Sequence, residues 1–166
     1  DFAQAGYPRD AAAILLIEID GSSSNVEEQL QTTREVLQHA GVVSVKVARN
    51  AQERALFWKG RKNAFPAVGR ISPDYYCMDG TIPRKSLAEV LGYISALSNE
   101  YGFAVANVFH AGDGNLHPLI LFDANIDGQL ERVEAMGAKI LEKCIDVGGT
   151  ITGEHGVGLE KIRQMP

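Results

Sequence analysis

A glycine-rich reversal between two apolar runs constrains this chain more than any other feature. Phe103 to Phe109 and Leu119 to Phe122 are apolar runs of strand length, and the segment between them contains Gly112-Asp-Gly-Asn115. Glycine, aspartate and asparagine tolerate the positive φ angles of tight reversals. The sequence therefore predicts a β-hairpin here.

Two histidines, His110 and His117, bracket this reversal. If His110 faces His117 across the hairpin, both side chains emerge on one face with Cβ atoms roughly 5 Å apart, close enough to bind one metal ion. A lone histidine at a strand end is more often a hydrogen-bonded structural residue, but a pair around a turn favours metal ligands. Asp113 is explained by a turn hydrogen bond and is left out of the ligand set.

A second glycine-rich cluster, residues 148–158, contains the adjacent pair Glu154 and His155. Glycines let a backbone approach a ligand closely, and few packing reasons demand this composition. Adjacent side chains can point in different directions, one towards a metal and the other towards a substrate. Three of the four histidines therefore lie in the two glycine-rich clusters.

Composition indicates one globular domain over residues 1–166, because the chain is 45% hydrophobic and 22% charged. A net charge of −5 without a block of lysine or arginine argues against nucleic acid as a partner. The longest apolar run, Ala11 to Ile17, is too short for a transmembrane segment. Cys77 and Cys144 are too few for a disulfide framework, which favours a reducing cytoplasm.

The order of expected elements is β-α-β-(α)-β-α-β-β-α. It predicts a ferredoxin-like α+β sandwich, a mainly antiparallel sheet with helices on one face. Strands are expected at residues 12–19, 42–47 and 75–78, besides the hairpin. Helices are expected from Ser24, where Glu27 completes a capping box, from Asn50 with Glu53 in the same role, from Pro83, and over 126–147.

Two motifs carry a resemblance to a known family: His110-Ala-Gly-Asp-Gly-Asn-Leu-His117-Pro and Gly153-Glu-His-Gly-Val-Gly158. They resemble the paired signatures of the flavin-dependent D-2-hydroxy acid dehydrogenases of the vanillyl-alcohol oxidase superfamily, in particular the branch formed by the flavin-containing subunits of glycolate oxidases. Supporting stretches lie at residues 5–8, 18–21, 57–65 and 79–83. Members of this family combine an N-terminal FAD-binding domain with a C-terminal substrate-binding cap domain, and only the latter matches here.

The resemblance therefore implies a C-terminal fragment of a larger flavoprotein. The chain starts at Asp1 without a methionine and has no βαβ dinucleotide fingerprint, which agrees with that expectation. The fragment alone is expected to be inactive.

The family pattern also implies roles for individual residues. His110, His117 and Glu154 would bind a divalent ion, with Zn²⁺, Mn²⁺ and Fe²⁺ left open. His155 would take the proton of the substrate hydroxyl, and FAD would accept the hydride. Arg61 would pair with the substrate carboxylate and Asn115 would add a polar contact; a solvated arginine and a turn asparagine are the alternatives.

The implied substrate is a small 2-hydroxy acid. Relatives that take dicarboxylic substrates have a lysine two residues before the aspartate that corresponds to Asp79, whereas this chain has Cys77. This difference favours a monocarboxylate such as glycolate or D-lactate, without choosing between them. The resemblance further implies other glycolate oxidase subunits as partners, and leaves open attachment to the periphery of the inner membrane through them.

Two other classes compete with this interpretation. One is a ferredoxin-like metal-binding or regulatory module without catalysis, which would leave no open coordination position on its ion. The other is a metal-dependent hydrolase that uses His155 as base on a metal-bound water, which predicts ester or amide turnover by this chain alone.

Overall fold

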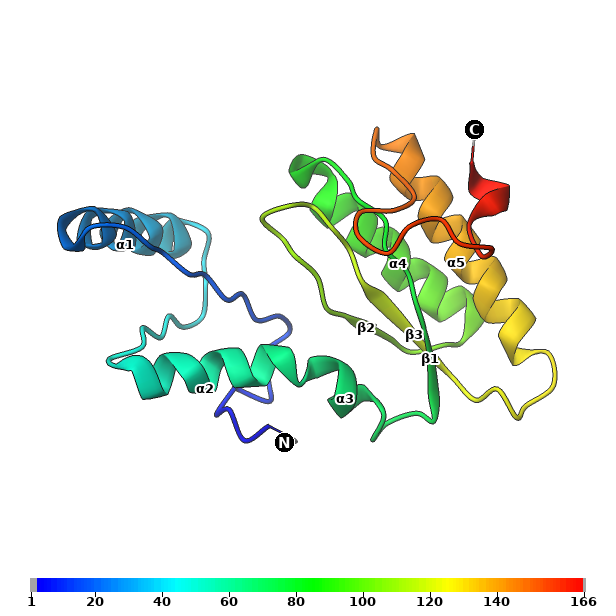
Figure 1. Ribbon diagram of the computed structural model, residues 1–166, viewed down its shortest axis with the longest axis horizontal. Coiled ribbons are helices and arrows are strands. Elements are labelled where there is room, and N and C mark those ends of the chain that lie inside the picture. The colour runs from blue at the N-terminus through cyan, green and yellow to red at the C-terminus, as the bar shows by residue number, and fades with distance from the viewer. Residues whose placement is uncertain (1–2, 166) are drawn as a thin grey trace. The chain divides into compact units, whose positions relative to one another are not determined.

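The computed structural model describes residues 3–165, which belong to two compact units, one ending at Asn63 and one beginning at Ala64. Figure 1 traces the chain, and each unit is described by itself. The single domain expected over residues 1–166 stays a prediction. Within residues 3–165, no helix combines the length and apolar content needed to cross a bilayer.

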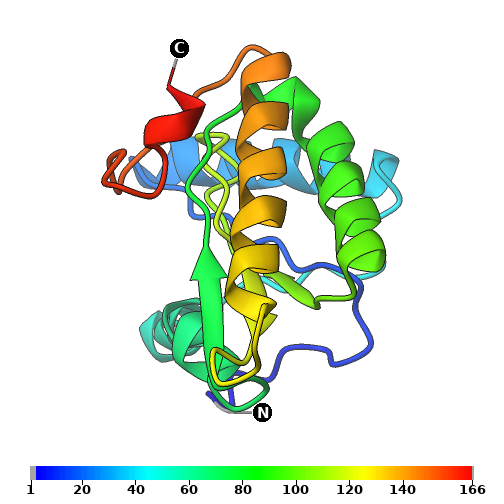
Figure 2. The same cartoon turned by 90° about the vertical axis from the view of Figure 1, so that its right-hand side faces the viewer.

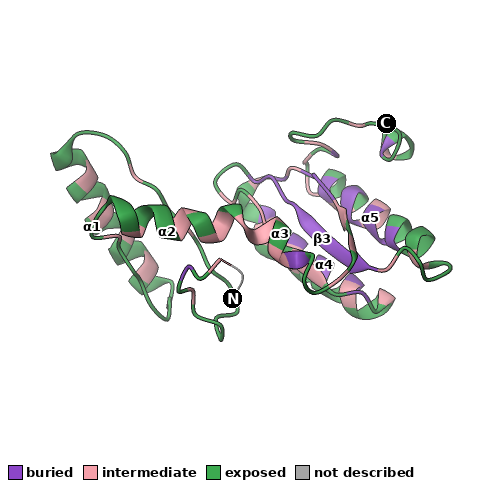
Figure 3. Ribbon diagram, turned by 60° about the horizontal axis from the view of Figure 1, so that its bottom comes forward, coloured by how far each residue is buried: buried purple, intermediate pink, exposed green. Residues whose placement is uncertain are grey.

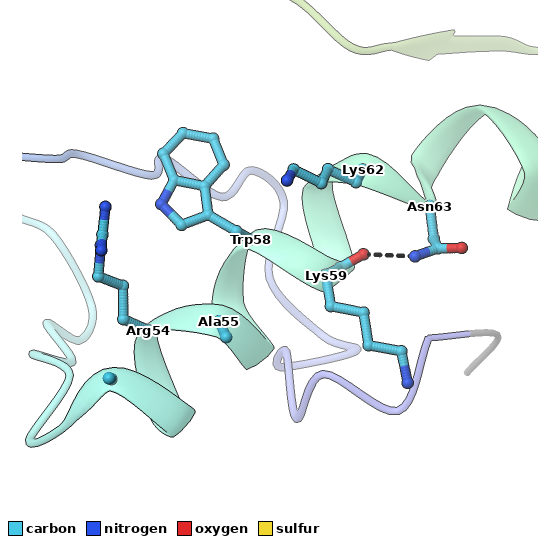
Figure 4. A pocket seen from close by; sticks show the side chains of 7 residues that line it. Arg54, Ala55, Trp58, Lys59, Lys62 and Asn63 are labelled. Carbon is cyan, nitrogen blue, oxygen red and sulfur yellow. Dashed lines mark hydrogen bonds between the residues drawn. The ribbon is translucent and has the colours of Figure 1, made fainter.

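The N-terminal unit contains two helices, α1 (Ser23–His39) and α2 (Ala51–Lys62). The predicted Asn50 cap of α2 is confirmed, because Asn50 Oδ1 accepts the Glu53 N–H at 2.9 Å. The Glu53 carboxylate accepts the Arg49 N–H at 2.8 Å, one residue before the N-cap, which differs from the reciprocal bond of a capping box. The predicted capping box of α1 is wrong, because its N-cap is Ser22 and the Ser22 side chain makes no capping hydrogen bond. A pocket along α2 is lined by Ala51, Arg54, Ala55, Trp58, Lys59, Lys62 and Asn63 (Figure 4).

The strands predicted at residues 12–19 and 42–47 are wrong. Neither segment belongs to a strand, and nearly all of their residues are exposed, Val43 completely. Apolar patterning is not enough for a strand, because its backbone groups need a neighbouring strand and its apolar side chains need a cover. The predicted N-terminal βαβ unit is therefore absent from residues 3–63.

The C-terminal unit contains an antiparallel sheet of three strands in the order β1-β3-β2. Its strands are β1 (Asp74–Cys77), β2 (Val105–Asn107) and β3 (Pro118–Phe122). Ile120 of β3 pairs with Tyr76 on one side and with Val105 on the other. All five residues of β3 are buried (Figure 3). The predicted hairpin is thereby confirmed, with β2 and β3 as its arms.

Helices α4 (Leu87–Tyr101) and α5 (Gln129–Asp146) lie side by side against one face of this sheet (Figure 2). Their buried residues, such as Ile94 and Ile140, share one apolar core with Ile120. The short helix α3 (Ala64–Val68) covers the other face, where Val68 packs on Leu119 and Leu121. Two 3₁₀ helices, Arg84–Ser86 and Ile162–Gln164, complete the unit.

The predicted α+β class is confirmed, with α4 and α5 on one face of an antiparallel sheet. The order β1-α4-β2-β3-α5 matches the first five elements of the ferredoxin-like β-α-β-β-α-β pattern. Within the described residues the sheet has three strands, and the chain after α5 adds only an isolated bridge between Thr150 and Thr81. The ferredoxin-like detail stays a prediction.

Candidate active site

The hairpin connection positions His110 and His117. The His110 N–H donates to the Asn115 carbonyl at 2.9 Å, and the Val108 N–H donates to the His117 carbonyl at 3.3 Å. His110 therefore lies opposite Asn115, and the direct facing of His110 and His117 that was considered from the sequence does not occur. Asn115 and His117 are two residues apart on the same arm, so their side chains share a face. The two histidines meet diagonally, with ring centroids 5.6 Å apart.

Glu154 reaches both histidines from the loop that follows α5. Its Oε1 lies 3.8 Å from His110 Nε2, and its Oε2 lies 3.7 Å from His117 Nε2. One ligand atom from each residue lies within 4.8 Å of the other two. His117 is buried, whereas His110 and Glu154 are half exposed at 47% and 51%. The three residues predicted as ligands therefore meet at one opening to solvent.

His155 also lies against His117. The two rings are stacked, with centroids 5.1 Å apart and an interplanar angle of 9°. His155 is exposed, so its ring is accessible to a small molecule beside Glu154. Adjacent residues of one loop thus present a carboxylate and an imidazole to the same buried histidine.

Burial lowers the pKa of His117 below its ordinary value, although the Met78 backbone and the carboxylates of Glu154 and Asp79 oppose this shift. The neutral imidazole is the form that binds a metal ion. Asp79 Oδ1 lies 3.8 Å from His117 Nδ1, which has no hydrogen-bond partner among residues 3–165. The electrostatics therefore leave His117 as a neutral ligand at neutral pH.

Asp79 holds the Glu154 and His155 loop in place. This fully buried carboxylate accepts the backbone N–H groups of Gly153, Glu154 and His155, the last at 2.7 Å, and the Thr152 hydroxyl at 2.8 Å. Lys161 Nζ, also buried, lies 3.5 Å away. The sequence analysis assigned Asp79 no role in the site. A carboxylate directly after an apolar strand is the sequence feature that could have indicated one.

Acid is expected to loosen this loop. Burial alone would raise the pKa of Asp79, but hydrogen bonds from the His155 N–H, the Thr152 hydroxyl and the neighbouring N–H groups hold it well below its usual range. A lowered folded-state pKa contributes stability above the unfolded value of about 3.9, and that stability is lost as pH falls through the folded value. Urea unfolding between pH 6 and pH 2 should show this loss, and Asp79→Asn should flatten it. An unchanged slope in Asp79→Asn would contradict the role of Asp79.

Gly153 allows the loop to approach the hairpin. A Cβ atom there would lie 2.3 Å from Thr81 Oγ1 and 2.8 Å from Asn115 Nδ2. Gly153→Ala is therefore expected to displace the loop, to lower stability by about 1–3 kcal/mol and to weaken metal binding. Gly112→Ala is the matched control, because a Cβ there meets nothing within 4 Å. Denaturant unfolding and Mn²⁺ titration of both variants test this, and equal behaviour would contradict it.

The two predicted substrate-binding residues, Arg61 and Asn115, belong to different units of the chain. Arg61 lies on α2 in the N-terminal unit, and it is not among the described residues that line the pocket along that helix. Asn115 is buried in the hairpin beside Gly153, and its Oδ1 has no hydrogen-bond partner in the described part of the chain. This placement supports a structural contact between hairpin and loop for Asn115. Both substrate roles stay predictions.

Cys77 belongs to the site. The sequence pointed to this position only through the lysine of dicarboxylate-oxidising relatives, and gave the thiol itself no role as a ligand. Its Sγ shares a second group of potential ligand atoms with His117 and His155, again within 4.8 Å of one another. Burial and the charge of Asp79 raise the pKa of this thiol to about 11. The free side chain is therefore a neutral thiol at physiological pH.

The fold and the site define an α+β domain in which imidazole and carboxylate groups meet at a solvent-accessible site. This arrangement is typical of enzymes. Comparison with known proteins identifies the family. The chain belongs to the family "FAD linked oxidases, C-terminal domain", whose model matches residues 1–166.

Several curated relatives support this assignment. The chain is 62% identical over 165 residues to glycolate oxidase subunit GlcD of Escherichia coli K12, covering 99% of this chain and 33% of the relative. It is 39% identical to glycolate oxidase subunit GlcD of Bacillus subtilis, covering 95% and 34%. It is 32% identical to a probable mitochondrial D-lactate dehydrogenase of Danio rerio, covering 89% and 30%. The chain thus spans about a third of the length of these relatives.

Proposed function

We propose that this chain is the substrate-binding part of a flavin-dependent enzyme that oxidises glycolate or D-lactate to the 2-oxo acid. The observation that carries the proposal is the convergence of His110, His117 and Glu154 beside His155. The family assignment supports the flavin, and the names of the relatives supply the two substrates.

The donor set fits a divalent ion. Two ligands on one zinc ion lie roughly 3.3 Å apart, given metal bonds of about 2.0–2.2 Å. The distances from the Glu154 carboxylate to His117 and His110, 3.7 and 3.8 Å, need only small rotations of the half-exposed Glu154 and His110 side chains. Two imidazoles and one carboxylate suit Zn²⁺, Mn²⁺ or Fe²⁺ and leave coordination positions open. A bound ion would supply a Lewis acid that lowers the pKa of the substrate hydroxyl.

His155 then acts as the general base in this proposal. Oxidation of a 2-hydroxy acid removes a proton from the hydroxyl and a hydride from C2. The exposed imidazole of His155 would accept that proton beside the ion ligands. The stack on His117 and the hydrogen bond from the His155 backbone N–H to Asp79 hold the residue in position. FAD, held mainly by residues outside this chain, would be the hydride acceptor.

The remaining parts of the proposal concern substrate and surroundings. Arg61 would pair with the substrate carboxylate through its planar guanidinium, and Asn115 would add a polar contact. We further propose other glycolate oxidase subunits as partners and a cytoplasmic location, with peripheral membrane attachment through such subunits left open.

Turnover of 2-hydroxy acids by the longer protein tests the proposal. The flavin-loaded protein is assayed with glycolate and D-lactate and a dye acceptor, before and after chelation and after return of Zn²⁺, Mn²⁺ or Fe²⁺. We expect oxidation that is lost on chelation and restored by an ion, and no oxidation by residues 1–166 alone. Ester or amide hydrolysis by residues 1–166 alone would favour a hydrolase instead. Metal uptake without any turnover by the longer protein would favour a regulatory module.

A further inference from the structure

We propose that Cys77, His117 and His155 form a second metal-binding set, selective for soft, thiophilic divalent ions such as Cd²⁺. Their ligand atoms lie within 4.8 Å of one another. They come from the end of β1, the residue directly before β3 and the loop after α5. A thiolate with two imidazoles prefers softer ions than a carboxylate with two imidazoles does. The two sets share only His117 and differ in chemical preference.

An unsatisfied buried group supports a ligand at this place. His117 is only 3% exposed, and its Nδ1 has no hydrogen-bond partner within the described chain. Cys77 Sγ donates a 3.4 Å hydrogen bond to the Met78 carbonyl. A pocket lined by Cys77, His155 and residues 156–161 gives solvent access to the set. An ion could therefore reach the set without displacing a strong internal interaction of Cys77.

The surrounding charges also favour a cation. The charged groups that act on Cys77 are Asp79, Glu160 and Lys161, and their sum is negative. The ammonium of Lys161 lies 3.5 Å from Asp79, which offsets its charge locally. Binding forms a sulfur–metal bond and releases the thiol proton to solvent.

Occupation of the second set has a consequence for the first set. An ion held by Cys77 would share the His117 ring with the first set and would place a second positive charge beside it. It also occupies His155, the general base of the proposed function. Soft ions in excess would therefore inhibit 2-hydroxy acid oxidation. This inhibition rests on the proposed function, whereas binding of the ion to the second set does not.

Cadmium titration of the purified chain tests the second set. Thiolate coordination of Cd²⁺ produces a ligand-to-metal charge-transfer band in the ultraviolet. We expect this band in the parent chain and its loss in Cys77→Ser, with Cd²⁺ binding weakened at least about tenfold. Cys144→Ala is the matched control, because Cys144 is the other free thiol and is fully buried in α5. It should keep both the band and the affinity.

Further variants separate this proposal from the first set. His155→Ala changes an exposed side chain, so it should fold normally, weaken Cd²⁺ binding and leave Mn²⁺ binding unchanged. Glu154→Gln should weaken Mn²⁺ binding and keep the cadmium band. No band in the parent, or a band that persists in Cys77→Ser, would overturn the second set. Failure of Mn²⁺ to bind while the cadmium band appears would count against the first set only.

Discussion

Replacement of His155 by alanine is expected to lower kcat/KM for 2-hydroxy acid oxidation by about 10²–10⁴-fold in the flavin-loaded longer protein. The physical reason is the loss of the imidazole that accepts the hydroxyl proton. His155 is not among His110, His117 and Glu154, so Mn²⁺ binding should persist. Steady-state kinetics with glycolate or D-lactate, together with Mn²⁺ titration, measure both parts.

His39→Ala is the matched control for this variant. His39 is the fourth histidine of the chain, lies exposed at the end of α1 and bonds locally to the Glu35 carbonyl. Its replacement should leave turnover unchanged. Activity that survives His155→Ala with little loss would exclude His155 as the base, whatever the state of the metal site.

Replacement of His117 by alanine is expected to weaken divalent metal binding at least about 100-fold, since even the loss of an outer hydrogen-bond partner costs 10–100-fold. His117 is the most buried of the three ligands and lies within 4 Å of Glu154 and of Asp79. Its removal takes away one donor and the surface on which the His155 ring stacks. Metal content by mass spectrometry after chelation and reloading with Zn²⁺ or Mn²⁺ measures the loss.

His110→Ala tests whether metal loss in His117→Ala comes from the missing ligand or from misfolding. Its side chain is 47% exposed, so its removal leaves no buried cavity while still taking away one ligand. Both variants should lose metal and keep their helical circular dichroism. Stoichiometric metal in His110→Ala and His117→Ala alike would refute the proposed ligand set.

The site residues that could be predicted from sequence are those whose partners are close along the chain. His110 and His117 flank one turn, and Glu154 and His155 are adjacent, so local motifs reveal them. The anchoring role of Asp79 and the ligand role of Cys77 were not predicted, because their partners are distant in the sequence. Asp79, for example, accepts the Glu154 N–H across 75 residues. A pattern within one segment carries no information about such a contact.

The fold shows the same division. The Asn50 cap follows from local chemistry and was predicted from it. The end of α4 at Gly102, where φ is 74°, has the same local origin. The apolar segments at 12–19 and 42–47 were predicted as strands, yet they have no strand partner within residues 3–165. An alternating pattern or a run of apolar residues indicates a preference for the strand conformation. Only a neighbouring strand can satisfy the backbone hydrogen-bonding groups of such a segment.

By itself the sequence determined the donor types, the turn between the two histidines and the glycine-rich loop that carries Glu154 and His155. These features depend on backbone preferences and side-chain chemistry within a few residues. Only the tertiary structure decided the pairing of His110 with Asn115 and the anchoring of the loop on Asp79. Strand register and buried hydrogen bonds depend on groups that are distant in the sequence and become buried next to one another in the fold. The register of the hairpin and the anchored loop together bring the imidazoles and the carboxylate of the site within reach of one ion.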